Sequence, residues 1–363
     1  MTKERRDPLA ACRRAIKGGK DMRNRMTASM LALGLLSMAA AGAPARAQDT
    51  LEATVGYYPG ALISMPALVA KEGKFFEKNG LKVELVPVST GPAMTAAVAS
   101  GSVTFVNNSW DNLLSAVEKG LPVRGVAGST VKVPFSLIAR KGLPLPHLKD
   151  GYPAVIQDLV GKTWGVLALG VSVHFMSQTI LTDAGFKPTD ATFIAVGLPN
   201  TARPALQRGT VDTYLSVEPL PSLAQAKNEA TIVVDLARNQ GPKVFHDLGY
   251  NGWWASLSTI KDKPQLVDRF AKSLEEAYCW YSNPANLDQV VSLMQQFVKV
   301  PDLTPEQYKD MVKRLIPTFG PDITARTIDT WSALLVEHKQ LQAPKKRADV
   351  IAATARESFT CPK

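Results

Sequence analysis

Residues 71–88 read KEGKFFEKNGLKVELVPV, and this stretch decides the fold class. Its first half is charged around a Phe75-Phe76 pair and is interpreted as the end of a helix. Asn79 and Gly80 predict a helix stop, because glycine adopts the left-handed turn after a helix without a steric penalty. From Leu81 to Val88 apolar and charged residues alternate, which is the period of a strand. The stretch therefore predicts a helix that leads directly into a strand.

The same alternation of strand and helix continues on both sides of this stretch. Strands are expected at 54–57, 81–88, 103–106, 123–127, 133–139, 163–167, 192–196, 211–215 and 231–234. Helices are expected between them at 61–71, 92–100, 111–119, 171–184, 199–208 and 219–227, and then in a tail at 261–282, 284–298, 304–317 and 322–340. Alternation with short links is typical of parallel sheets covered by helices. We expect two α/β lobes, with the helical tail returning to cover the first lobe.

Length and charge exclude several classes of protein. A chain of 363 residues is long enough for two lobes, and 45% apolar with 20% charged residues is a globular balance. The net charge of +10 is concentrated at the start, because residues 1–47 contain ten Lys and Arg against three Asp and Glu. The small excess left in the other residues gives no argument for nucleic-acid binding.

The basic start of the chain predicts export. Arg23 and Arg25 precede an apolar run at 30–41, and Ala45-Arg46-Ala47 has the small-x-small form of a cleavage site. This order is typical of a secretory signal peptide, cleaved near Ala47, with a basic extension in front of it. The run is shorter than the roughly 20 residues that a membrane span needs. The true start codon stays open, and the mature protein is expected in the periplasm.

Two cysteines follow the expected leader, Cys279 and Cys361. In an oxidising compartment they can pair, or Cys279 can be buried as a free thiol while Cys361 is exposed; both possibilities stay open. Two cysteines alone cannot form a structural zinc site, and the histidines lack metal-ligand spacing. The chain has no nucleophile elbow, P-loop or dinucleotide motif, so neither an enzyme nor a cofactor is predicted.

Six segments, in order, resemble periplasmic substrate-binding proteins of the nitrate/sulfonate/taurine class of ABC importers. The longest is Ala70 to Leu85, which resembles the family pattern A-x-x-x-G-F-F-x-x-x-G-L-x-V-x-L. The others are AVASGSVTF (97–105), KGLPV (119–123), DLVGK (158–162), ALQRGTVD (205–212) and Glu218-Pro219. One departure is Thr104, which stands where the family often has Asp.

The resemblance implies a type II-like periplasmic binding fold in which two crossover strands, near 134–139 and 250–257, join the lobes. It places 51–133 with 257–363 in lobe 1, and 134–256 in lobe 2. It also implies an extracytoplasmic solute-binding component that is not an enzyme, acts as a monomer, holds a small molecule in the cleft and delivers it to an inner-membrane ABC permease.

Ligands of open α/β sheets bind beyond the carboxyl ends of the strands, and this rule selects the candidate site residues. The loops after the expected strands contribute Tyr57, Tyr58, Asn107, Asn108, Ser109, Trp110, Ser129, Thr130, Gly170, Val171, Ser172 and His174. Glu218, after a later strand, and Trp253, at the second crossover, complete the set. Only one of Trp253 and Trp254 is expected to face the cleft, because neighbours on a strand point opposite ways.

Gly170 to Ser172 suggests a place for an acid group, because free amides and the positive end of the dipole meet at a helix start. Alternatively, Ser172 only caps its own helix. Tyr57, Tyr58 and Trp110 would contact the apolar part of the ligand, or else belong to the core.

The predicted ligand is a small organic anion, either a sulfonate or an aromatic or aliphatic carboxylate. Since the loops carry no obvious strong cation, a neutral heteroaromatic such as a pyrimidine or thiamine precursor is the alternative. A less favoured alternative is an enzyme like the fungal thiamine-pyrimidine synthases, which resemble the family but carry a cysteine-rich cluster.

Overall fold

Two five-stranded sheets form the centres of two lobes in the computed structural model, which describes residues 49–362. The expected signal peptide and its cleavage site lie outside the described residues. The first sheet contains β1 (Leu51–Tyr57), β2 (Leu81–Pro87), β3 (Phe105–Ser109), β4 (Val123–Gly128) and β10 (Asn251–Ser256). The second contains β5 (Phe135–Arg140), β6 (Thr163–Val166), β7 (Thr192–Ala195), β8 (Thr213–Val217) and β9 (Ala230–Asp235).

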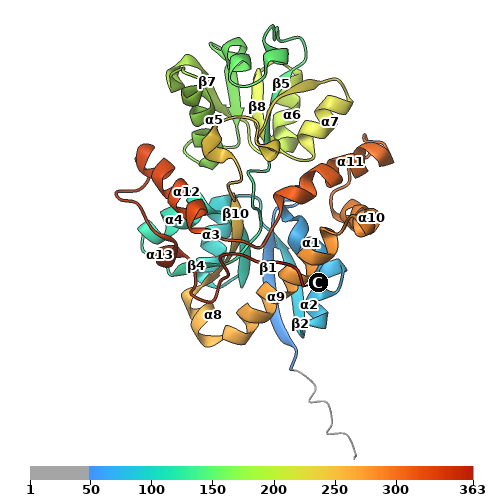
Figure 1. The fold of residues 1–363 in the computed structure, drawn as a ribbon, viewed down its shortest axis with the longest axis vertical. Coiled ribbons are helices and arrows are strands. Elements are labelled where there is room, and N and C mark those ends of the chain that lie inside the picture. The colour runs from blue at the N-terminus through green and yellow to red at the C-terminus, as the bar shows by residue number, and fades with distance from the viewer. Residues whose placement is uncertain (1–48, 363) are drawn as a thin grey trace, which may run out of the picture. The chain divides into compact units, whose positions relative to one another are not determined.

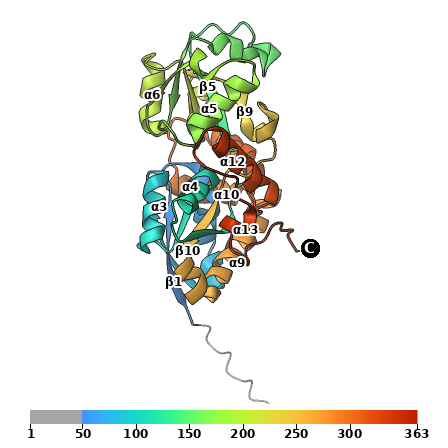
Figure 2. The same ribbon diagram turned by 90° about the vertical axis from the view of Figure 1, so that its left-hand side faces the viewer.

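Helices flank both sheets (Figures 1 and 2). The first lobe has α1 (Met65–Glu72), α2 (Phe75–Lys78), α3 (Gly91–Ser100), α4 (Trp110–Glu118), α8 (Leu257–Asp262), α9 (Pro264–Tyr281), α10 (Leu287–Phe297), α11 (Pro305–Leu315), α12 (Ala325–Glu337) and α13 (Arg347–Val350). The second lobe has α5 (Ser172–Asp183), α6 (Pro199–Gln207) and α7 (Leu220–Ala226). The chain's end thus lies beside the first sheet.

Each sheet is mixed. The strand orders are β2-β1-β3-β10-β4 and β7-β6-β8-β5-β9. β10 runs antiparallel to both of its neighbours, and so does β5, whereas the other pairs are parallel. The chain crosses between the sheets twice, from β4 to β5 and from β9 to β10. Since β10 lies in the first sheet, the second sheet ends at residue 235, whereas the sequence extended lobe 2 to residue 256.

The stretch at 71–88 folds as a helix followed by a strand, with one correction. Leu81 pairs with Leu51 at the start of a parallel β1–β2 ladder, and the residues of β2 begin with the expected alternation of buried and exposed. However, the charged half is not the end of one helix. The backbone breaks between α1 and α2, where Lys74 has a left-handed φ of 59°. A side chain at Gly73 would collide with the Phe75 ring, at 2.5 Å, so this turn requires glycine.

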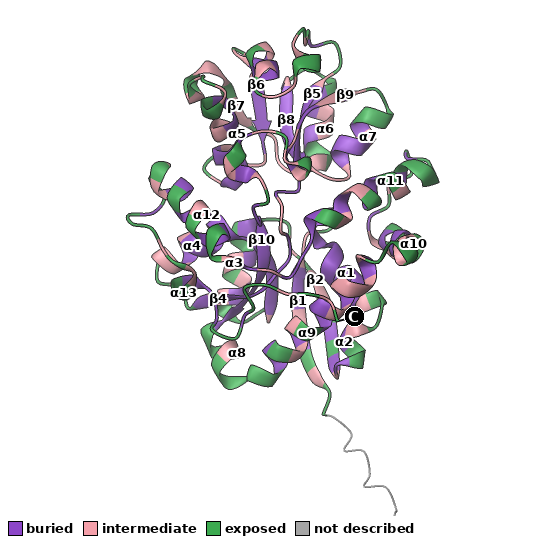
Figure 3. Cartoon of the chain, in the orientation of Figure 1, coloured by how far each residue is buried: buried purple, intermediate pink, exposed green. Residues whose placement is uncertain are grey.

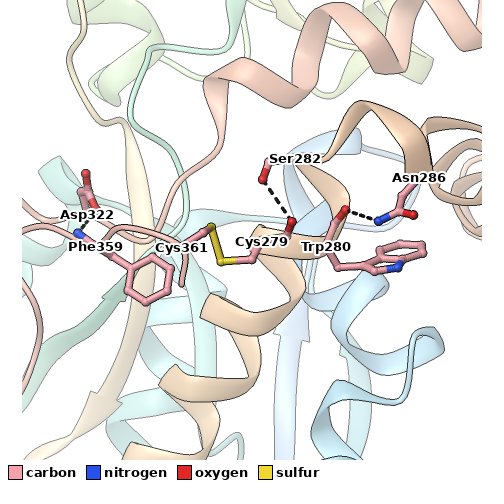
Figure 4. The surroundings of a disulfide bond; sticks show 7 residues. All are labelled: Cys279, Trp280, Ser282, Asn286, Asp322, Phe359 and Cys361. Carbon is pink, nitrogen blue, oxygen red and sulfur yellow. Dashed lines mark hydrogen bonds between the residues drawn. A yellow bond between two sulfur atoms is a disulfide. The ribbon is translucent and has the colours of Figure 1, made fainter. Parts of the chain in front are cut away.

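The C-terminal tail is tied down by a disulfide. Cys279 on α9 is bonded to Cys361, with their Cα atoms 5.5 Å apart (Figure 4). The alternative in which both cysteines stay free is therefore wrong. Next to the bridge, the Phe359 amide donates a 2.8 Å hydrogen bond to Asp322 Oδ1. The bridge and this bond hold the tail against the first lobe.

One apolar core extends through both lobes. Buried Trp110 and Trp254 of the first lobe belong to the same cluster as Trp164 and Phe175 of the second. A second cluster fills the side of the first sheet that is covered by α1 and α9, and a small one lies beneath α6 and α7. Buried residues are therefore found within both lobes and in the segments of chain that join them (Figure 3). The lobes are in contact in this structure.

Candidate functional site

The Asn107 to Ser109 segment is strand rather than loop. The sequence ended the third strand at residue 106, but β3 continues to Ser109 because its last residues pair with β10. All three side chains are buried, and Trp110 begins α4 directly. The expected loop after the third strand is therefore absent, and the polar residues stand at the end of β3, next to the start of a helix.

Asn108 organises the first-lobe side of the site. Its Oδ1 accepts hydrogen bonds from the Tyr58 hydroxyl at 3.2 Å, the Ser109 amide at 2.9 Å and Asn112 Nδ2 at 3.2 Å. Its Nδ2 donates to the Gly91 carbonyl at 2.9 Å. These hydrogen bonds fix the orientation of the Asn108 side-chain amide, because its oxygen and its nitrogen each have defined partners. Tyr58 is thereby oriented toward the end of β3.

Ser172 links the second lobe to the segment that precedes β10. Its hydroxyl lies 2.9 Å from the hydroxyl of Tyr250, and both residues are buried. Val171, not Ser172, is the N-cap of α5, and the cap makes no side-chain hydrogen bond. The alternative in which Ser172 only caps its own helix is therefore not what the geometry shows. The α5 N-terminus instead points its first hydroxyl at an aromatic residue from the connection between the lobes.

Asp111, in the first turn of α4, lies beside this contact. Its side chain is 4% exposed, and its Oδ1 has no hydrogen-bond partner among the described residues. Burial raises the pKa of the Asp111 carboxyl, while the hydroxyls of Ser109 and Ser172 and the helix amides lower it. We refer to Tyr58, Asn108, Ser109, Asp111, Ser172 and Tyr250 as the interlobe cluster.

The two tyrosines of the interlobe cluster share this environment. The pKa of each phenol is raised, first by burial and then by nearby acidic groups, including Asp111. Both therefore keep their protons at neutral pH and can donate hydrogen bonds. The cluster combines aromatic rings, hydroxyls and one carboxylate, and it draws on both lobes and the connection between them.

Thr130 and Ser129 hold this connection in place. The Thr130 hydroxyl accepts hydrogen bonds from the amides of Tyr250 at 2.9 Å and Asn251 at 3.1 Å. The amides of Ser129 and Thr130 both donate to the Asn251 carbonyl at 3.2 Å. Both residues are buried, and they position Tyr250 through the backbone.

Several other sequence-predicted site residues belong to the core. The Trp110 ring lies against β4 and β10, so closely that a Cβ at Gly252 would be 2.1 Å from its Cη2. Trp253 is buried with its ring edge-on to Phe270, at 5.6 Å, and Trp254 is buried in the core shared by both lobes. Tyr57 packs against the second core cluster, and the Asn107 side chain accepts a hydrogen bond from Asn251. The structure does not bring these side chains into the interlobe cluster.

Gly170 and His174 lie at the rim. Gly170 is exposed with a φ of 74°, and its amide donates to His174 Nδ1 at 3.1 Å. The His174 ring is edge-on to Phe193, with centroids 4.9 Å apart. Burial and the nearby His338 lower the pKa of His174. The histidine therefore holds the loop before α5 and contacts Phe193 of its own lobe, with His338 of the first lobe nearby.

Glu218 belongs to a separate contact between the lobes. Its carboxylate accepts hydrogen bonds from the Ser222 hydroxyl at 2.7 Å and amide at 3.1 Å, and Arg314 of α11 lies 3.7 Å away. The Leu62 amide, from the first lobe, donates to the Glu218 carbonyl at 3.2 Å. Burial raises the pKa of Glu218, and its bonds with Ser222 and Arg314 oppose that shift.

Sequence reasoning did not select Asp111, Tyr250 or Arg314. Asp111 is the first residue of the helix expected at 111–119, and its negative charge fits that position. Tyr250 precedes the second crossover, where the Trp253-Trp254 pair was the more conspicuous aromatic feature. Arg314 is in the helical tail, so only the return of that tail to the lobe boundary brings it near Glu218. A systematic search for acids next to strand ends would have found Asp111.

Within residues 49–362, no group of three or more His, Cys, Asp or Glu side chains is placed to hold a metal ion. The same range contains no helix with the length and apolar character needed to cross a membrane.

A sequence profile described as "NMT1/THI5 like" matches residues 63–286, which is more than half of the chain. The chain belongs to the NMT1/THI5-like family. A protein of Bacillus subtilis (strain 168) assigned to aliphatic sulfonate binding is 28% identical over 262 residues, which cover 69% of this chain and 71% of that protein. The riboflavin-binding protein RibY of Chloroflexus aurantiacus is 24% identical over 302 residues, covering 79% of this chain and 78% of RibY.

Solved structures show the fold of this NMT1/THI5-like chain. The aliphatic sulphonate binding protein SsuA from Escherichia coli has a TM-score of 0.65 at 18% identity, covering 83% of this chain and 97% of that one. The alkanesulfonate-binding SsuA from Xanthomonas axonopodis, bound to MOPS, has a TM-score of 0.64 at 18% identity, covering 85% and 99%. The expected periplasmic binding protein fold is confirmed.

Proposed function

We propose that this protein is the extracytoplasmic solute-binding component of an ABC importer, which captures a small molecule between its lobes and delivers it to a membrane permease. The observation that carries the proposal is the Ser172–Tyr250 contact, where the second lobe, the connection and the first-lobe residues around Asp111 meet. A ligand held there touches both lobes, so binding would favour the closed arrangement.

The α5 N-terminus supports the small organic anion as a ligand. The amides of Ser172 and Val173 have no acceptor among residues 49–362, and the positive end of the dipole lies beside them. An acid group there would accept two amide hydrogen bonds and one from the Ser172 hydroxyl. The sulfonate-binding relatives and structural neighbours support the same class.

The neutral heteroaromatic is the second candidate, and the aromatic content of the interlobe cluster favours it. Tyr58 and Tyr250 supply flat apolar area with a hydroxyl at the edge, which suits a ring. RibY, a flavin binder by name, supports this class.

One relative is an enzyme, but the similarity to it covers less than half of either chain. The 4-amino-5-hydroxymethyl-2-methylpyrimidine phosphate synthase of Schizosaccharomyces pombe is 27% identical, over 42% of this chain and 41% of the enzyme. The resemblance described under the sequence analysis associates such fungal synthases with a cysteine-rich cluster. The two cysteines in residues 49–362 are consumed by the Cys279–Cys361 bridge. That bridge also favours an oxidising compartment, in line with export to the periplasm.

Thermal unfolding of residues 48–363 against sulfonates, carboxylates, nitrate and pyrimidines tests the proposal. A ligand at about 100 times its dissociation constant adds ~2.7 kcal/mol of stability, which corresponds to a shift of several degrees. Small-angle scattering of the same sample, with and without the active compound, reports lobe closure. If no compound shifts unfolding and scattering is unchanged by the whole panel, the binding role is wrong.

Ser172→Ala localises the site. Removing the hydroxyl should weaken binding of the active compound about tenfold, since a hydrogen bond to a charged group contributes ~1.5–3 kcal/mol. Ser177→Ala is the matched control, because Ser177 is buried on the same helix and bonds only the Val173 carbonyl, at 2.8 Å. Equal affinities for the two variants would place the ligand elsewhere.

A further inference from the structure

We propose that Asp111 makes the interlobe cluster select ligands that present a protonated nitrogen, such as an amidinium or a ring-bound ammonium group. This inference rests on the proposed function, and of its two candidate ligands it favours the heteroaromatic, in a form that carries a protonated nitrogen, over the organic anion. It concerns the cluster of Tyr58, Asn108, Ser109, Asp111, Ser172 and Tyr250 alone.

One oxygen of the buried Asp111 carboxyl is unsatisfied by the described residues. Asp111 is 4% exposed, and its Oδ1 has no hydrogen-bond partner within residues 49–362. Buried carboxylates are almost always paired, because an unpartnered polar group in the interior is destabilising and a charged one is more so. A ligand that donates to Oδ1 would remove this cost, so the cluster is complete only when such a ligand is bound.

Asp111 also has no cationic partner among the described residues. None of the ion pairs found within residues 49–362 includes Asp111. Arg314, which also serves the lobe boundary, pairs with Glu218. The hydroxyls of Ser109 and Ser172 and the amides of Asp111 and Asn112 lie close enough to the carboxyl group to lower its pKa. The protein thus supplies hydrogen-bond donors for one side of Asp111 and no countercharge.

A purely structural role explains part of this arrangement. Asp111 is in the first turn of α4, where the helix dipole and free amides stabilise a negative charge. That role accounts for a carboxylate at this position. It does not account for burial at 4% exposure with one oxygen unpartnered, since first-turn acids perform the same role at the surface.

Asp111 also affects whether an acid group of a ligand can bind at Ser172. The Ser172 hydroxyl at the start of α5 is close enough to Asp111 to affect its ionisation. An anion bound at that hydroxyl would hold the Asp111 carboxyl in its protonated form, whereas a bound cation would favour its ionisation. A cation would be attracted by the same carboxylate, and the aromatic rings of Tyr58 and Tyr250 offer it further favourable contact.

Three probes of the same shape and different charge test this inference. Benzamidinium, benzamide and benzoate are titrated into residues 48–363 by calorimetry at pH 7. We expect benzamidinium to bind at least tenfold more tightly than benzamide, and benzoate to bind most weakly. Asp111→Asn should reduce benzamidinium affinity tenfold or more and leave that of benzamide within threefold, because the amide keeps the shape and removes the charge.

Glu275→Gln is the matched control. Glu275 is also a buried carboxylate of the first lobe, but it pairs with Arg356 Nε at 2.8 Å, away from the cluster. This variant should keep the preference of the wild type for benzamidinium. Circular dichroism and melting temperature establish that each variant is folded, and the order of the three probes on the wild type tests the inference even where Asp111→Asn unfolds.

The outcomes separate this inference from the proposed function. Benzoate binding as tightly as benzamidinium, or unchanged benzamidinium affinity in Asp111→Asn, would overturn the role of Asp111 and leave a solute-binding protein. If benzamidinium fails to bind at 10 mM while a sulfonate or carboxylate shifts the unfolding temperature, the role of Asp111 is also overturned and a solute-binding protein remains. Only the absence of binding and closure with every compound of both panels contradicts the proposed function itself.

Discussion

A buried hydrogen bond between the hydroxyls of Ser172 and Tyr250 joins the second lobe to the connection between the lobes. Tyr250→Phe removes this hydrogen bond and keeps the ring, so we expect the free energy of unfolding to fall by about 1 kcal/mol. Ligand affinity should also fall severalfold, because Ser172 loses its partner. Chemical denaturation and ligand titration measure the two effects.

Tyr308→Phe is the control for this substitution. Tyr308 is buried in the first lobe and donates to the Val298 carbonyl at 3.0 Å. Its loss should reduce stability by a similar amount and leave ligand affinity unchanged. If ligand affinity fell in both variants, the effect of Tyr250→Phe would come from the loss of overall stability and not from the loss of its contact with Ser172.

Two histidines at the lobe boundary predict sensitivity to acid. His174 is on α5, and His338, at the end of α12, stacks on Phe175 of α5 at 4.7 Å. Burial lowers the pKa of both imidazoles, and His338 further lowers that of His174. The unfolded chain therefore takes up these protons first, so stability contributed by the neutral rings is present above about pH 6.5 and is lost as the pH falls below it.

The measurement is the free energy of unfolding between pH 7.5 and 5. The wild type should lose stability over this range, and a His174→Gln, His338→Gln double variant should lose less. His147 is the opposing group, since its hydrogen bond with Asp158 raises its pKa and should stabilise the fold at low pH. Equal pH slopes for the wild type and the double variant would rule out the two buried rings as the cause.

Part of the interlobe cluster could be predicted from the sequence. Tyr58, Asn108, Ser109 and Ser172 follow from the rule that ligands lie at the carboxyl ends of strands. Trp110 was placed in a polar loop because Asn and Ser precede it, but the pairing of β3 with β10 extends the strand and turns the indole into the core. This strand pairing joins residues more than 140 positions apart, and a local sequence pattern holds no information about such distant partners.

At the scale of single elements, the disulfide links α9 to the end of the chain. Cys361→Ser should lower the free energy of unfolding by roughly 2–4 kcal/mol, because the unfolded chain is no longer closed into a loop that spans 82 positions. The melting temperature should fall by several degrees. A reducing agent should destabilise the wild type to the level of the variant and leave the variant unaffected.

The limits of pattern reading are clearest at element boundaries. The alternation in β2 and the stop at Gly80 depend only on neighbouring residues, and both agree with the structure. The break between α1 and α2 depends on the approach of Gly73 to the Phe75 ring. Likewise, the expected helix at 261–282 is divided at Lys263, just before Pro264, into α8 and α9. Proline at the first position of a helix is a start signal, and α9 begins at Pro264 instead of residue 261.

At the scale of the whole molecule, charged residues bridge the lobes on the side of α6 and α7. Asp302, between α10 and α11, lies 3.5 Å from Arg203 and 3.3 Å from Lys227 of the second lobe. The neighbouring Lys227 and Arg203 lower the pKa of Asp302. These groups are partly exposed, so salt should screen them.

Asp302→Asn should therefore shift the ligand-free protein toward an open arrangement. We expect a larger radius of gyration by small-angle scattering at low salt, and the difference from the wild type should shrink as salt is raised. Asp288→Asn is the control, because Asp288 pairs with Lys309 within the first lobe. A radius that is the same for Asp302→Asn and the wild type at every salt concentration would mean that the bridge does not hold the lobes together.

The Cys279–Cys361 bridge has a consequence for the protein under mechanical force. When the two ends of the described chain are pulled apart, tension passes from residue 279 to residue 361 through the two sulfur atoms. The intervening segment, which spans 82 positions and includes α10 to α13, can lose its fold and yet add nothing to the extension. The fully stretched molecule should therefore lengthen by about 300 Å on addition of a reductant. The second lobe, inserted between β4 and β10, stays within the pulled part of the chain.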